Sequence, residues 1–113
     1  MKIAVIGSRD LLVDISAYIS PEDEIVSGGA RGVDSCAADY ARRHGNKLTE
    51  FLPDYNSFGR KAPLIRNKEI VNYADKVLAF WDGESHGTWF VIDYAKKVGK
   101  PCHVVLVKRK QSL

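Results

Sequence analysis

The clearest structural signal in this chain is the segment Ser27-Gly28-Gly29-Ala30-Arg31-Gly32-Val33-Asp34, which joins a predicted strand to a predicted helix. Three glycines within five residues permit left-handed backbone and a close approach of another molecule. The helix that follows has apolar positions at helical spacing and a glycine at its end: Val33, Cys36, Ala37, Tyr40, Ala41 and His44, then Gly45. Its start offers unpaired N–H groups and the positive end of a helix dipole. The segment therefore predicts an anion-binding turn, with a tight turn whose glycines only serve packing as the alternative.

Apolar, β-rich runs alternate with helical patterns on both sides of this segment. The predicted strands are Lys2–Ile6, Glu24–Val26, Lys47–Phe51, Lys76–Trp81 and Cys102–Val107. The predicted helices are Asp10–Ile19, Val33–His44, Pro63–Tyr73 and Thr88–Val98. The first helix would direct Leu12, Ile15 and Ile19 inward, and the last would direct Val91, Tyr94, Ala95 and Val98 inward. This alternation predicts an α/β fold with a mostly parallel sheet and helices on both faces.

Size and composition favour one domain. The chain has 113 residues, of which 45% are hydrophobic, enough for one core, so we expect a single domain over residues 1–113 with a basic C-terminal tail at 108–113. The formal net charge of +3 is spread along the chain. Cys36 and Cys102 lie far apart and form no metal-binding spacing, so neither a disulfide framework nor a metal site is expected. No apolar run has the length of a signal or a membrane span, so we expect a cytoplasmic protein with no membrane partner.

The candidate binding residues lie where strands lead into helices, because ligands of open α/β sheets bind outside the carboxyl ends of the strands. Arg66 and Asn67 join them because they lie four residues before the core positions Ile70 and Val71, on the buried side of the third helix. The full set is Gly7, Ser8, Arg9, Ser27, Gly28, Gly29, Ala30, Arg31, Gly32, Asp34, Arg66, Asn67, Asp82, Gly83, Ser85, Gly87 and Thr88.

Several of these residues have a second explanation. Ser8 or Asp10 could cap the first helix, and Ser85 or Thr88 could cap the fourth. Arg9 could be a surface arginine in a turn. A buried-side arginine at position 66 needs an anionic partner, which is either a ligand phosphate or an internal carboxylate. The loop Pro53–Ala62, with Tyr55, Phe58 and Arg60, could fold over a base or ribose or could pack on the surface.

Catalysis has weaker support in the sequence. The dinucleotide fingerprint G-x-G-x-x-G is missing after the first strand, and no acidic residue closes the second strand, which disfavours NAD-dependent hydride transfer. Glu84, His86 and Asp93 are weak candidates for a catalytic acid or base, with Asp34 a further possibility. No Ser/His/Asp or Cys/His set can be assembled, and no cofactor is required by any motif.

The order of the motifs resembles a known superfamily. Gly7-Ser8-Arg9, Ser27 to Asp34, Arg66-Asn67, Phe80-Trp81-Asp82-Gly83 and Ser85-His86-Gly87-Thr88 together resemble the SLOG superfamily, in particular its small YpsA/YspA-like branch of single-domain bacterial and phage proteins. The Ser27–Asp34 segment also looks like the nucleotide-type loop of DNA-processing protein A (Smf), whose Rossmann domain binds single-stranded DNA. The resemblance implies a Rossmann-like sheet ordered 3-2-1-4-5 whose glycine loops bind nucleotides.

The resemblance also bears on enzymatic activity. The Lonely-Guy branch cleaves the base from nucleoside monophosphates and carries Pro-Gly-Gly-x-Gly-Thr-x-x-Glu after the fourth strand. Here only Gly87-Thr88 of that signature remains, and Val91 stands where the glutamate should be. We therefore expect a module that binds or senses a nucleotide-derived ligand, such as ADP-ribose or a mononucleotide. A phosphoribohydrolase of the Lonely-Guy type and a single-stranded DNA-binding protein are the alternatives. Nucleic acid is not favoured by the modest net charge, and a homo-oligomer stays open.

Overall fold

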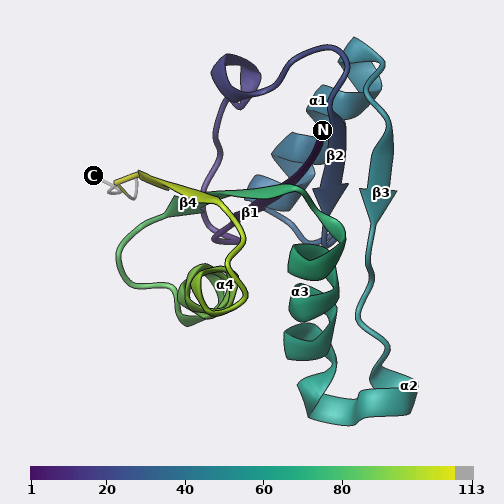
Figure 1. Cartoon of the computed structure of the whole chain (residues 1–113), viewed down its shortest axis with the longest axis vertical. Coiled ribbons are helices and arrows are strands. Elements are labelled where there is room, and N and C mark those ends of the chain that lie inside the picture. Colours follow the sequence, from purple (N-terminus) through teal and green to yellow (C-terminus); the bar gives the residue numbers. More distant parts are fainter. Residues whose placement is uncertain (109–113) are drawn as a thin grey trace.

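The chain folds into a five-stranded sheet in the order β3-β2-β1-β4-β5, as the computed structural model shows for residues 1–108 (Figure 1). The strands are β1 (Lys2–Gly7), β2 (Glu24–Ser27), β3 (Leu48–Glu50), β4 (Lys76–Trp81) and β5 (Cys102–Leu106). Every neighbouring pair is parallel. The predicted α/β class, the parallel sheet and the 3-2-1-4-5 order are confirmed. Of the predicted tail at 108–113, residues 109–113 lie outside the described part of the chain.

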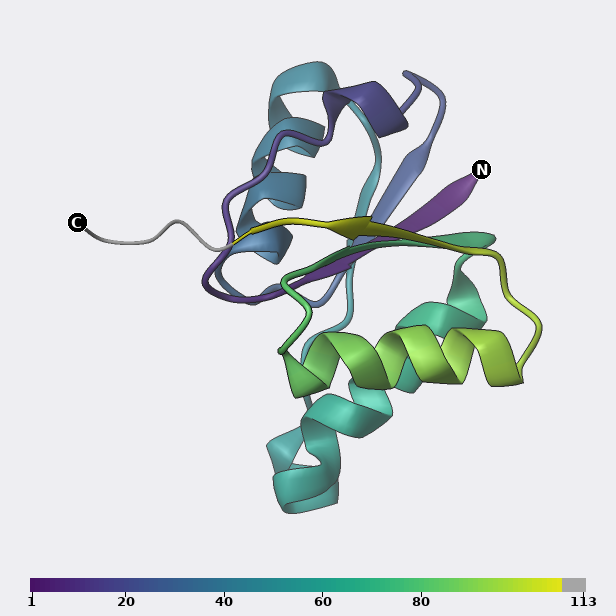
Figure 2. The ribbon, with the colours of Figure 1, turned by 90° about the vertical axis from the view of Figure 1, so that its left-hand side faces the viewer.

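The helices cover both faces of the sheet. They are α1 (Val33–His44), α2 (Tyr55–Phe58), α3 (Ala62–Tyr73) and α4 (His86–Lys97), with short 3₁₀ turns at Ser16–Tyr18 and Gly59–Lys61. Figure 2 shows α1 on one face and α3 and α4 on the other. Successive residues of β1 serve opposite faces, since Ile3 and Val5 pack on the α1 side whereas Ala4 and Ile6 pack on the side of α3 and α4. The central strands are therefore buried on both faces, as their apolar sequences predict.

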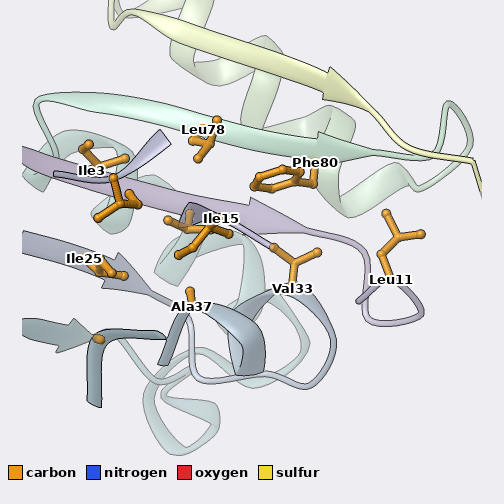
Figure 3. Close-up of a cluster of buried hydrophobic side chains, with 11 residues drawn as sticks. Ile3, Leu11, Ile15, Ile25, Val33, Ala37, Leu78 and Phe80 are labelled. Carbon is orange, nitrogen blue, oxygen red and sulfur yellow. The ribbon is translucent and has the colours of Figure 1, made fainter. Parts of the chain in front are cut away.

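The core on the α1 side also contains apolar side chains from the segment between β1 and β2. Leu11 and Ile15 belong to the same buried cluster as Val33 and Ala37 of α1 (Figure 3). This segment is the one predicted as the first helix.

The predicted helix Asp10–Ile19 is wrong, because only Ser16–Tyr18 forms a 3₁₀ turn. Leu12, expected inward, is 83% exposed, whereas its neighbour Leu11 is buried. A side-chain oxygen takes a backbone donor that the helix would use, because the Asp14 Oδ1 accepts from the Ser16 N–H at 2.9 Å. At the start of the segment, the Ser8 Oγ accepts from the Asp10 N–H at 3.3 Å. Neither Ser8 nor Asp10 caps a helix, since none forms there.

Smaller differences concern the ends of elements. α4 begins two residues earlier than predicted and ends at Lys97, so Val98 lies outside the helix and is exposed, contrary to the expectation that it points inward. The loop predicted over Pro53–Ala62 contains α2, whose start is capped by the Asp54 side chain accepting from the Ser57 N–H at 3.1 Å. Among the described residues, none of the helices combines the length and the apolar character needed to cross a bilayer.

Candidate functional site

A cleft of about 390 Å³ lies at the carboxyl ends of the central strands. Its walls come from the loop after β1, the turn between β2 and α1, the first turns of α3 and the start of α4. The lining residues are Ile6, Gly7, Ser8, Arg9, Asp10, Gly28, Ala30, Arg31, Asp34, Pro63, Leu64, Arg66, Asn67, Ile70, Ser85, Gly87 and Thr88. We call this space the cleft.

The loop after β1 and the turn before α1 are held together by direct backbone contact. Gly32 has a φ of +74°, and a Cβ atom placed on it would lie 2.5 Å from the Arg9 carbonyl group and from the Ser8 carbonyl oxygen. The Val33 N–H donates to that Ser8 oxygen at 3.3 Å. At Gly7, an added Cβ would collide with the Val33 side chain. These glycines are therefore required for two cleft walls to approach each other.

The Asp34 carboxylate occupies the turn between β2 and α1, where the sequence predicted that a ligand anion would bind. The buried Asp34 carboxylate accepts from the Ala30 N–H at 3.1 Å. Burial raises the pKa of Asp34, while the Ala30 N–H and the Arg66 guanidinium act in the opposite direction. Asp34 thus occupies at least one backbone donor of the Gly28–Gly32 turn that the sequence suggested for a phosphate.

Arg66 of α3 is 7% exposed and lines the cleft together with residues of the Gly28–Gly32 turn. Its Nη1 donates to the carbonyl oxygen of Gly28 and, at 3.3 Å, to that of Phe51, while its Nε donates to Asn67 Oδ1 at 2.9 Å. None of these three bonds involves Nη2. A Cβ on residue 28 would lie 2.6 Å from Arg66 Nη1 and 3.0 Å from Asp34 Oδ2, so Gly28 makes room for both side chains. Of the two partners considered for Arg66, the internal carboxylate of Asp34 is therefore nearby, although two backbone carbonyls and the Asn67 side chain accept the hydrogen bonds described here.

The start of α4 forms the opposite wall of the cleft. Ser85 precedes the helix, and the Asp82 Oδ1 shapes the turn by accepting from the Glu84 and Ser85 N–H groups at 2.9 and 2.8 Å. The Ser85 and Thr88 hydroxyl oxygens lie 3.3 Å apart, and Ser85 makes no side-chain cap to the helix backbone. The N–H groups of the first helical turn lack partners within the helix, so this end of α4 is suited to an anion.

Not every predicted residue reaches the cleft. Gly29 faces a neighbouring hollow, Gly32 holds the two loops together, and Asp82 shapes the turn before α4. Ser27 is fully buried and its Oγ accepts from the Gly29 N–H at 3.4 Å, and Gly83 adopts a φ of +85° in an open turn. The lining described above does not include these five residues, so they shape or flank the cleft.

The weak catalytic candidates are also absent from the cleft lining. Asp93 pairs with Lys97 at 3.0 Å along α4, and neither Glu84 nor His86 lines the cleft. The carboxylates that do line it are Asp10 and Asp34. Among residues 1–108 there is no group of three or more His, Cys, Asp or Glu side chains that could hold a metal ion.

Sequence reasoning missed part of the lining. Asp10 was considered only as a helix cap, and Pro63 only as a helix start, yet both line the cleft together with Leu64. The signal was available for Pro63 and Leu64, because the first turn of α3 had already been placed at the ligand end of the sheet through Arg66. Asp10 reaches the cleft because the loop after β1 does not continue as a helix.

Comparisons with known proteins show a similarity to a solved structure. No family model and no curated protein matches the chain. A solved structure of DNA processing protein A from Helicobacter pylori, studied for its single-stranded DNA binding mode, is similar with a TM-score of 0.70 and 22% sequence identity, over 99% of this chain and 68% of that chain. At this identity the similarity shows a shared fold, so the DprA-like, Rossmann-like architecture is supported. The placement in the SLOG superfamily and its YpsA/YspA-like branch stays a prediction.

Proposed function

We propose that the cleft binds a phosphate-bearing nucleotide or nucleotide-derived ligand. The observation that carries this proposal is the convergence of three arginines, from three different segments, with the start of α4 around one cleft of about 390 Å³. Arg9 follows β1, Arg31 precedes α1 and Arg66 lies in α3. Guanidinium groups and helix starts are the protein groups that best match the geometry and charge of a phosphate.

The charge distribution favours one position for the phosphate. Asp34 already accepts a hydrogen bond within the Gly28–Gly32 turn, and a second anion deep in that turn would be repelled by its carboxylate. Arg9 and Arg31 are exposed, and their side chains can follow a ligand. We therefore propose that the phosphate lies between these two arginines and the start of α4, above the turn.

The remaining lining suits a nucleoside. Pro63, Leu64 and Ile70 supply apolar surface from α3, and Asn67 supplies an amide next to it. Buried Ser8 lies on the opposite wall and carries a hydroxyl. A cleft with apolar walls and a few polar groups is typical of sites for small ligands.

Binding without hydrolysis fits this arrangement better than a phosphoribohydrolase does. Val91, which stands where the Lonely-Guy enzymes carry glutamate, is fully buried in the core on the α4 side. Asp34 is the only buried carboxylate that lines the cleft among the described residues, and it is held by the Ala30 N–H. A hydrolase would have to use Asp10 or Asp34 as its acid or base.

Single-stranded DNA binding is the second candidate. It is favoured by the fold shared with DNA processing protein A of Helicobacter pylori, which is described as binding single-stranded DNA. The same arginines would then contact the DNA backbone, and binding would weaken steeply as salt is raised.

Calorimetry with matched arginine variants tests the proposal. We expect AMP or ADP-ribose to bind the parent protein, and Arg31→Gln to weaken binding by about tenfold to a hundredfold, because one charge-assisted hydrogen bond contributes about 1.5–3 kcal/mol. Arg60→Gln is the control, since Arg60 is exposed and does not line the cleft. Absence of binding by both ligands, or equal binding by both variants, would contradict the proposal. Binding of oligo(dT) but not of mononucleotides would favour the second candidate.

A further inference from the structure

A second hollow adjoins the cleft and is not used by the proposed mononucleotide site. It has a volume of about 390 Å³ and lies beside the end of β3, where Gly29, Leu52 and Pro53 line it. We call it the side pocket. The side pocket and the cleft share five lining residues: Arg9, Gly28, Ala30, Arg31 and Arg66. The two hollows therefore adjoin along one shared boundary, which we call the common wall.

The common wall is cationic. All three arginines of the cleft belong to it, and Arg66 is held in place by the carbonyl oxygens of Gly28 and Phe51. The carboxylates of Asp10 and Asp34 line the cleft but not the side pocket, and the Glu50 carboxylate lies close to Gly29 of the side pocket. A phosphate on this wall would lie beside the three arginines.

Each hollow has an exposed leucine beside a proline in its lining. Leu52 is 68% exposed and lines the side pocket with Pro53. Leu64 is 43% exposed and lines the cleft with Pro63. Each Leu and Pro pair offers apolar surface that the flat face of a nucleobase can cover.

We propose, building on the function proposed above, that the ligand contains two nucleosides joined through phosphate. The bridging phosphate lies at Arg9 and Arg31 of the common wall, where the phosphate is placed above, one nucleoside occupies the cleft, and the other occupies the side pocket against Leu52. This chemistry is shared by pyrophosphate-linked dinucleotides and by two successive nucleotides of single-stranded DNA. A mononucleotide fills the cleft alone.

Calorimetry with three probes tests this inference: AMP, the pyrophosphate-linked diadenosine diphosphate, and the phosphodiester-linked dinucleotide pdApdA. We expect at least one dinucleotide to bind about tenfold or more tightly than AMP. Leu52→Ser should remove most of that advantage and leave AMP affinity within about twofold. Leu12→Ser is the matched control, because Leu12 is an exposed leucine that lines neither hollow. Circular dichroism verifies that both variants are folded.

The outcomes distinguish the two-nucleoside inference from the proposed mononucleotide site. If AMP binds but neither dinucleotide binds more tightly, or if Leu52→Ser weakens AMP and dinucleotides equally, the two-nucleoside inference is wrong and the proposed mononucleotide site stands. If none of the three probes binds, the two-nucleoside inference is wrong, and if ADP-ribose does not bind either, the proposed function is wrong as well. Tighter binding of diadenosine diphosphate identifies a pyrophosphate-linked ligand, and tighter binding of pdApdA identifies nucleic acid; either result supports the inference.

Discussion

Replacing Gly32 with alanine should destabilise the protein far more than the same change at two other glycines with similar φ. The φ angles of Gly29, Gly32 and Gly45 are +70°, +74° and +75°. Their surroundings differ: a Cβ at Gly45 would meet nothing within 4 Å, one at Gly29 would meet the movable end of Leu52, and one at Gly32 would meet the backbone of Ser8 and Arg9 at 2.5 Å.

The magnitudes follow from these contacts. An alanine in left-handed backbone costs about 1–2 kcal/mol, which is the whole effect expected at Gly45 and most of that at Gly29. At Gly32 the positive φ of +74° costs alanine a similar amount, and overpacking against backbone adds about 1–3 kcal/mol. We therefore expect Gly32→Ala to lose about 2–5 kcal/mol in total.

Thermal unfolding followed by circular dichroism measures the difference. With an unfolding entropy of about 2.1 cal/mol/K per residue, 1 kcal/mol shifts the Tm of this 113-residue chain by about 4 °C. Gly45→Ala should melt about 4–8 °C below the parent, and Gly32→Ala about 8–20 °C below it. Equal Tm values for Gly32→Ala and Gly45→Ala would refute the close backbone contact between the two cleft walls.

Two further predictions concern the buried carboxylate and the segment after β1. Because burial raises the pKa of Asp34 above its ordinary 3.8, the folded state binds this proton more readily, and the unfolding free energy falls as pH rises from below 3.8 through the folded pKa. Asp34→Asn should therefore gain stability relative to the parent as pH rises from below 3.8 through the folded pKa of Asp34 in urea titrations, and a difference that does not change with pH would contradict this sign. Leu11→Ala should lower the free energy of unfolding by about 2–4 kcal/mol, since Leu11 is 3% exposed, whereas Leu12→Ala should change it by no more than about 0.5 kcal/mol. The reverse order in chemical denaturation would favour the helix predicted from the sequence over the observed loop.

The elements that sequence reasoning located well are those whose local pattern and final packing agree. The apolar spacing of α1, its αL glycine at Gly45 and the proline in the first turn of α3 were all readable, and the structure has them. The helix predicted between β1 and β2 was wrong because Leu12, Ile15 and Ile19 occur at helical spacing, yet Leu11 is buried in place of Leu12 and Asp14 binds a backbone donor locally. A helical spacing of apolar residues indicates that their side chains face the core. An irregular loop can direct residues at that spacing into the core as well.

The sequence was enough for the α/β class, the parallel sheet and the position of the glycine-bearing loops, because strand and helix periodicity and turn chemistry are local properties. The partners of Arg66 and the role of Asp34 were decided only by tertiary structure. The Arg66 guanidinium bonds to the carbonyl of Gly28, 38 residues away in the chain, and the turn that contains Gly28 uses Asp34 as its own anion. Such contacts depend on where folding places distant backbone atoms and on which charges burial desolvates, and no local pattern of residues encodes either.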